Sequence, residues 1–201
     1  MSLSTYADLQ ASVANWLHRS DLTAIIPDLV TIAEMRMNSD IIARDMEVTV
    51  NLTTVPNVKT LAMPTDVTET RRLVLTSQDP KRVLTYIAPE NLTVEYPYST
   101  TGIPEVFTVI GNNFEFGPTP DNAYTLEYVY RQRITPLATT GTNWLMTKWP
   151  HVYLYATLCA AAPYLGQDQR VAVWEDSYQK AVQDINSVDW FSGSVMKVRT
   201  A

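Results

Sequence analysis

The chain has 201 residues, of which 46% are hydrophobic and only 18% charged, and its formal net charge is −6. This length and composition predict a globular protein of one large domain or a two-part domain, and the low charged fraction indicates that a partner covers part of the surface. The longest cationic clusters are the pairs Arg71–Arg72 and Lys81–Arg82, which argues against tight, sequence-independent binding to a phosphate backbone. No apolar run approaches the length of a membrane span and the N-terminus does not resemble a signal peptide, so we expect a cytoplasm-like compartment.

Two helices are predicted at the N-terminal end. Apolar residues recur at helical spacing after a capping Ser4 or Thr5, namely Tyr6, Leu9, Val13, Trp16 and Leu17. A second helix begins near Pro27, which suits a first helical turn. We expect its polar face to carry Asp28, Glu34 and Arg36.

A strand pattern replaces the helical period from Met46 on. Apolar and polar residues alternate between short turns, which predicts strands at 46–53, 58–63, 71–76, 82–86, 105–110, 113–116 and 123–131. The Gly111–Asn112 step is typical of a tight hairpin, and a short helix is expected at 89–96. Short strands with frequent turns favour a small antiparallel sandwich or barrel.

The helical period returns after a Thr-rich linker at 135–142. Pro150 opens a strongly apolar helix, which Pro163 and Gly166 end. Asp168 is the expected cap of a last helix. The apolar stripe of that helix consists of Val171, Trp174, Tyr178, Ala181, Val182 and Ile185.

These patterns predict an α+β fold in which a helical bundle, formed by the N- and C-terminal segments, carries an inserted antiparallel β-sandwich or barrel domain. The bundle is expected to be discontinuous and to comprise residues 1–45 and 136–189. The inserted β domain is expected at 46–135, and a C-terminal docking arm at 190–201.

Few side chains point to catalysis or to metal binding. The two histidines, His18 and His151, have no second His or Cys at ligand spacing and are expected to be solvated or to cap helices. The single cysteine, Cys159, lies in an apolar helical run, which favours a small buried side chain. There is no glycine-rich phosphate loop. We therefore predict no catalytic residue, no cofactor site and no metal site.

Two weaker patterns leave alternatives open. Asp40, Asp45 and Glu47 fall together where the helical pattern ends, and form either an acid–base pair or cation site, or a solvated junction with salt bridges to Arg44. The aromatic residues of the strand region are either core or a platform on which sugars or bases stack.

Three stretches together resemble the head-to-tail adaptor (connector) proteins of tailed bacteriophages. They are 26–40 (IPDLVTIAEMRMNSD), 103–121 (IPEVFTVIGNNFEFGPTPD) with its continuation at 124–130, and 143–158 (NWLMTKWPHVYLYATL) followed by 160–165. Each stretch alone is moderately specific. Their order and spacing along one chain carry the resemblance.

The resemblance implies a structural virion protein that is not an enzyme. About twelve copies would form a homo-oligomeric ring beneath the portal protein, extend the DNA channel and offer a docking surface to tail or nozzle proteins. DNA would pass through the channel without specific binding, which fits the acidic charge, and no membrane is involved. Such a protein is assembled in the bacterial host cytoplasm and located in the neck of the virion, between capsid portal and tail.

The segment 190–201 is predicted to be a docking arm or, alternatively, a frayed end. Its candidate partner-interface residues combine apolar and basic side chains and are Trp190, Phe191, Val195, Met196, Lys197, Val198 and Arg199.

Other functions remain open. The closest alternative is another neck or tail-completion protein of the virion. A ligand-binding β module would bind a sugar or peptide saturably as an isolated monomer, and a hydrolase would lose activity on replacement of Asp45 or Glu47. An adaptor ring predicts neither result.

Overall fold

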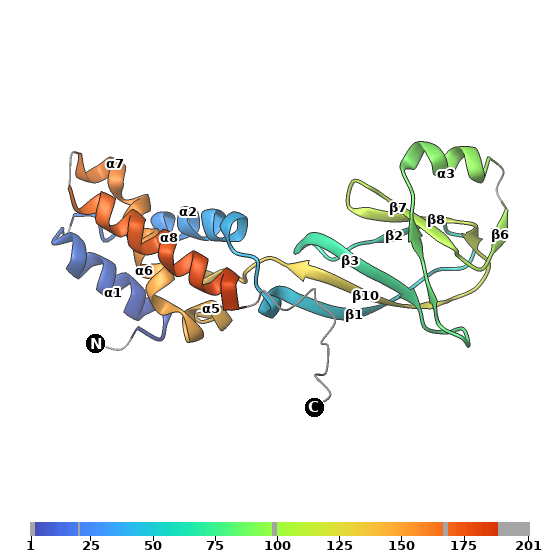
Figure 1. Ribbon diagram of the computed structural model, residues 1–201, viewed down its shortest axis with the longest axis horizontal. Coiled ribbons are helices and arrows are strands. Elements are labelled where there is room, and N and C mark those ends of the chain that lie inside the picture. Colours follow the sequence, from blue (N-terminus) through green and yellow to red (C-terminus); the bar gives the residue numbers. More distant parts are fainter. Residues whose placement is uncertain (1–2, 20, 98–99, 167–168, 189–201) are drawn as a thin grey trace, which may run out of the picture. The chain divides into compact units, whose positions relative to one another are not determined.

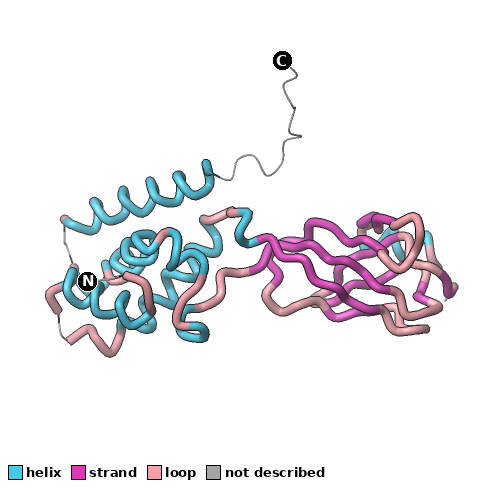
Figure 2. Tube along the Cα trace, turned by 90° about the horizontal axis from the view of Figure 1, so that it is seen from below, coloured by secondary structure: helices cyan, strands magenta, loops and turns pink. Residues whose placement is uncertain are grey.

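A computed structural model describes residues 3–19, 21–97, 100–166 and 169–188. The chain divides into two compact units: a helical unit, formed by the residues up to Met46 together with those from Ile134 onward, and a β unit, Glu47–Arg133. Figures 1 and 2 show that the strands lie in the β unit and that, apart from α3, the α-helices lie in the helical unit. The predicted α+β class is therefore confirmed.

The helical unit begins with two helices that the sequence predicted. Helix α1 (Tyr6–Leu17) starts with a capping box, in which the Thr5 hydroxyl accepts from the backbone of Asp8 and the Asp8 side chain accepts from the backbone of Thr5. It ends at His18, whose φ of 54° is left-handed. Helix α2 (Ile26–Asp40) has Pro27 in its first turn, and the short helix η1 (Arg44–Met46) follows it.

The second half of the helical unit contains more helix than the sequence predicted. The Thr-rich linker includes a one-turn helix, α4 (Leu137–Thr140). Helix α5 (Trp144–Lys148) then forms because the Asn143 side chain accepts a hydrogen bond from the backbone N–H of Met146 and so caps it. The remaining helices are α6 (Pro150–Ala160), α7 (Ala162–Leu165) and α8 (Arg170–Val188).

Helix α6 is the centre of the helical unit, since it packs against α1, α2, α5 and α8. Most of its side chains are apolar, and Val152, Tyr153 and Leu158 are fully buried. The stripe predicted for α8 faces the same core, where Trp174, Tyr178 and Ile185 are buried. Each such large apolar side chain contributes roughly 1.5–3 kcal/mol through its burial.

The β unit contains two four-stranded sheets. The first has the order β1 (Glu47–Thr53), β10 (Thr125–Gln132), β3 (Val67–Leu75) and β4 (Arg82–Val83), and its pairs are antiparallel. The second has the order β2 (Thr60–Ala62), β8 (Asn113–Gly117), β7 (Val106–Ile110) and β5 (Thr85–Tyr86). Helix α3 (Pro89–Glu95) and the short pair β6 (Thr101–Gly102) and β9 (Thr119–Pro120) complete the unit.

One hydrophobic cluster joins the inner faces of both sheets. The ring of Phe114 in β8 meets that of Tyr128 in β10 edge to face, with centroids 4.9 Å apart. The sheets stay open, so the barrel alternative is wrong. The strand predicted at 82–86 is divided between the two sheets. Val83 pairs with β3 of the first sheet and Thr85 with β7 of the second, and the buried Leu84 lies between them.

Candidate interaction surfaces

The chemistry of the described residues is sparse. In the described ranges, no group of three or more His, Cys, Asp or Glu side chains is arranged to hold a metal ion. His18 ends α1, and the ring of His151 lies edge-on to Trp149 and Tyr155, with centroids 5.9 and 6.5 Å away. Both histidines are solvent-exposed, and His18 caps a helix.

Cys159 is half-buried in α6. Burial, together with the nearby carboxylate of Glu175, raises the pKa of its thiol to about 12. The side chain is thus a neutral thiol at physiological pH and a poor nucleophile, since the thiolate is the reactive form.

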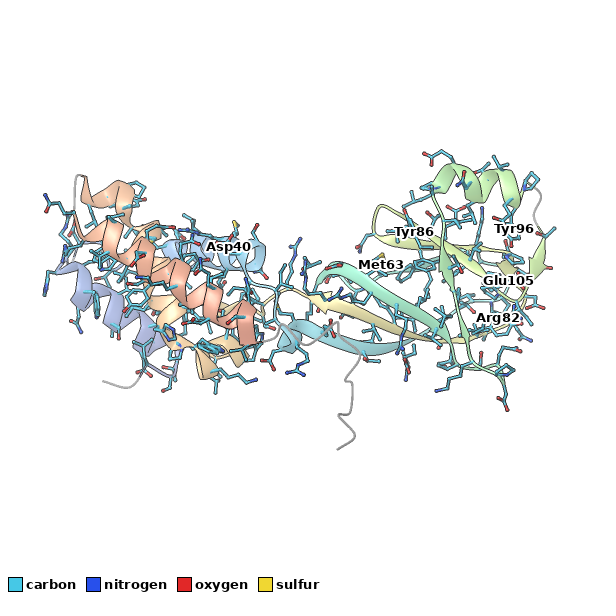
Figure 3. All side chains as sticks on the ribbon, in the orientation of Figure 1. Asp40, Met63, Arg82, Tyr86, Tyr96 and Glu105 are labelled. Atoms are coloured by element: carbon cyan, nitrogen blue, oxygen red, sulfur yellow. The ribbon has the colours of Figure 1, made fainter. Side chains whose placement is uncertain are left out.

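The three carboxylates predicted to gather at the end of the N-terminal helical region have separate partners. Asp40, labelled in Figure 3, accepts a hydrogen bond from the Tyr178 hydroxyl at 2.8 Å. Asp45 pairs with Lys148 at 2.7 Å. Glu47 pairs with Arg71 at 3.1 Å. The hypothesis of a shared acid–base or cation site is therefore not supported by these contacts.

A charged contact joins α2 to α8 across the helical unit. Both terminal nitrogens of Arg36 donate to the carboxylate of Glu175, and its guanidinium lies 4.3 Å from the centre of the Tyr178 ring. The hydrogen bonds from Arg36 hold the pKa of Glu175 at about 2, well below its usual range. Glu175 is therefore ionised at neutral pH, and the contact fixes the position of α8.

Asn186, near the end of α8, closes the C-terminus of α2. Its amide nitrogen donates to the carbonyl oxygen of Asp40 at 3.0 Å, and its amide oxygen accepts from the backbone N–H of Ile42 at 2.9 Å. The Asn186 side chain thus provides hydrogen-bond partners for one backbone carbonyl and one backbone N–H that have no partner in a next helical turn.

A buried polar cluster holds the segment that enters the helical unit at Ile134. Glu34, expected on the polar face of α2, is only 7% exposed and accepts from the backbone N–H of Leu137 at 2.8 Å. Burial raises the pKa of Glu34, while hydrogen bonds from Leu137 and Tyr153 oppose that rise. Asn38, one turn later, accepts from the backbone N–H of Ile134.

Sequence reasoning missed this role of Glu34, although the sequence carries a signal for it. Val30, Ala33 and Met37 form the buried stripe of α2, and position 34 falls within that stripe. An acidic residue at an apolar position indicates a buried acceptor with donors of its own.

The helical unit carries a row of ring contacts on its surface. Trp149 directly precedes α6, His151 and Tyr155 follow in the helix, and Tyr155 meets Trp16 of α1 with ring centroids 6.2 Å apart. Trp16 is 43% exposed. Aromatic residues are enriched in protein interfaces, so this row is a candidate contact surface.

The outer face of α2 exposes two large apolar side chains. Ile32 and Met35 lie one turn apart on the same face and are 53 and 68% exposed. Exposed side chains of this size favour a surface that another protein covers.

The outer face of the first sheet is a ladder of ion pairs. Arg71 lies beside Glu47 and Glu69, Arg131 beside Glu69, and Arg72 beside Glu127, at 2.6 to 3.7 Å. The pairs of Arg71 and Arg72 are exposed enough that each contributes only about 0–1 kcal/mol. These carboxylates also offset the charge of the short Arg71–Arg72 cluster, which weakens its attraction for a phosphate backbone.

Most aromatic residues of the β unit belong to its core, as one of the two alternatives predicted. The buried ones are Phe107, Phe114, Phe116, Tyr124, Tyr128 and Tyr130. Tyr86, labelled in Figure 3, is 57% exposed.

The predicted partner-interface residues lie outside the described residues. They are Trp190, Phe191, Val195, Met196, Lys197, Val198 and Arg199. The cap predicted at Asp168 also lies outside them.

The sequence profile of the SU10 adaptor protein family matches residues 4–199 and thus spans both units. None of the curated proteins matches the chain. Among the helices of the described ranges, none is both long and apolar enough to cross a membrane. Because the profile covers nearly the whole sequence, the chain belongs to the SU10 adaptor family, a family of phage head-to-tail adaptors, as its resemblance to the connector proteins predicted.

Proposed function

We propose that the protein is a structural component of the virion neck, where about twelve copies form a closed ring beneath the portal. The ring extends the DNA channel and offers a docking surface to tail or nozzle proteins. The observation that carries this proposal is the family match, which spans both the helical unit and the β unit. The proposed role requires no catalysis.

The surface chemistry supports an assembling protein. Ile32 and Met35 on α2 and the aromatic row that ends at Trp16 expose apolar area to solvent in the free chain. A ring with head-to-tail contacts covers such area in every copy, because each subunit presents two different faces to its two neighbours. The low charged fraction of the sequence fits the same reading.

The charge distribution supports a channel through which DNA passes without specific binding. The net charge is −6, and Arg71, Arg72 and Arg131 are each paired with a carboxylate. Cations that are already paired with carboxylates neutralise few phosphates and so release few counterions from DNA. They therefore hold DNA weakly.

We also propose that the two units act as separate domains and that residues 190–201 form an arm that contacts a neighbouring subunit or the portal. The apolar and basic composition of the arm supports this role.

Negative-stain electron microscopy of the full chain, alone and mixed with the portal ring of the same virus, tests the proposal. We expect rings in the free protein or on the portal. A monomer that does not bind the portal would overturn the proposal. Rings that bind tail components but not the portal would favour another neck or tail-completion protein.

A further inference from the structure

A small pocket lies at the C-terminal end of α8, within the helical unit. Three segments form it: residues 43–45 after α2, helix α5 with Trp149, and the last turn of α8 with Ile185 and Val188. Its volume is about 200 Å³.

The pocket has an apolar floor and a charged rim. Ala43 and Ile185 are buried, and Trp144 and Trp149 are partly buried members of the same hydrophobic cluster. At the rim, Lys148 pairs with Asp45 at 2.7 Å. A pocket of this size lies below the roughly 300–1,000 Å³ of small-molecule sites. It suits a single large side chain, and rings such as those of Trp144 and Trp149 favour an aromatic one.

The sequence has an aromatic residue shortly after the last residue that lines this pocket. Val188 is both a wall of the pocket and the last residue of α8, and Trp190 follows two residues later in the sequence. Two residues span at most about 7 Å, so the backbone of Trp190 is within reach of the pocket. A short tether gives a millimolar-range effective concentration, which favours the pocket of the same chain over that of a second copy.

We propose that the indole of Trp190 occupies this pocket of its own chain and fixes the point at which the C-terminal segment leaves α8. The inference deepens the proposed docking arm and rests on it for the role of the residues that follow. In the sequence, Ser192, Gly193 and Ser194 separate Trp190 from the stretch that begins at Val195. The apolar and basic stretch from Val195 to Arg199 is the part left to contact a partner.

Fluorine NMR of the full chain labelled with 5-fluorotryptophan tests this division. The resonances of Trp144, Trp149 and Trp190 are assigned with the variants W144F, W149F and W190F. We expect a soluble paramagnetic gadolinium chelate to broaden the Trp190 resonance severalfold less in the folded chain than in urea. Deletion of 189–201 should shift the resonances of Trp144 and Trp149, whereas the matched deletion of 195–201 should leave them in place.

Equal broadening of the Trp190 resonance in the folded and unfolded chains would overturn the proposal. Unchanged chemical shifts of Trp144 and Trp149 after deletion of 189–201 would overturn it as well. A mixing experiment separates the two possible donors of the side chain. If unlabelled full chain moves the resonances of labelled chain that lacks 189–201, the pocket takes the tryptophan of a second copy, and the proposal is also overturned.

The measurement needs neither ring nor portal, so its outcome is independent of the proposed function. A protected Trp190 in a chain that forms no ring would contradict only the adaptor ring. An exposed Trp190 in a chain that assembles on the portal would contradict only the seating of the indole.

Discussion

Replacing Glu34 by alanine removes the acceptor for two buried donors. The backbone N–H of Leu137 donates to the carboxylate at 2.8 Å, and the Tyr153 hydroxyl donates to it as well. Leu137 and Tyr153 are fully buried, so water does not replace the lost acceptor. The Tyr153 hydroxyl also accepts from Asn143, which caps α5, so the loss reaches the start of that helix.

The expected magnitude follows from the two unpaired donors. Each buried polar group left without a partner costs about 1–3 kcal/mol, and relief of the desolvated carboxylate returns part of this. We expect Glu34→Ala to lower the free energy of unfolding by about 2–4 kcal/mol. Glu34→Gln keeps an acceptor oxygen in place and removes the buried charge, so we expect a change within about 1 kcal/mol.

Urea unfolding followed by far-UV circular dichroism measures both variants against the unchanged chain. The glutamine variant is the matched control, since it differs from glutamate in charge but little in shape. An alanine variant as stable as the glutamine variant would refute the reasoning, because the buried donors would then have found other acceptors at no cost.

Three further predictions concern the rest of the chain. Arg36 lowers the pKa of Glu175 from 4.5 to about 2, so the stability that this contact provides is complete above pH 4.5 and is lost as the pH falls toward 2. Because the pair is partly exposed, we expect the free energy of unfolding to fall by about 1 kcal/mol over this pH range in acid unfolding curves. Glu175→Gln should be less stable than the unchanged chain at neutral pH and should not show this acid-dependent loss. Gly117→Ala should destabilise the β unit by about 1–3 kcal/mol in thermal unfolding, because the added Cβ would lie 2.7 Å from the Tyr96 ring; an unchanged melting temperature would contradict this close approach. Deletion of 191–201 should weaken ring or portal assembly in sedimentation while the monomer still melts cooperatively, and undiminished attachment would count against the arm.

Much of the local structure followed from the sequence. The helical spacing of Leu9, Val13 and Leu17 and the cap at Thr5 specify α1, because both depend on residues within one or two turns. The alternation along 125–132 specifies β10 in the same way, with Leu126, Tyr128 and Tyr130 buried. The family resemblance rested on similar short stretches and is confirmed by the profile match.

Tertiary structure decided which of these elements meet. The antiparallel pairing of β1 with β10, the division of 82–86 between two sheets and the burial of Glu34 join residues far apart in the chain. Arg36 and Glu175 lie 139 positions apart, and no local pattern connects them. Periodicity shows which face of an element is apolar. Which element packs against that face, and whether a charged residue such as Glu34 is buried in it, depend on packing between distant segments, which a single segment does not encode.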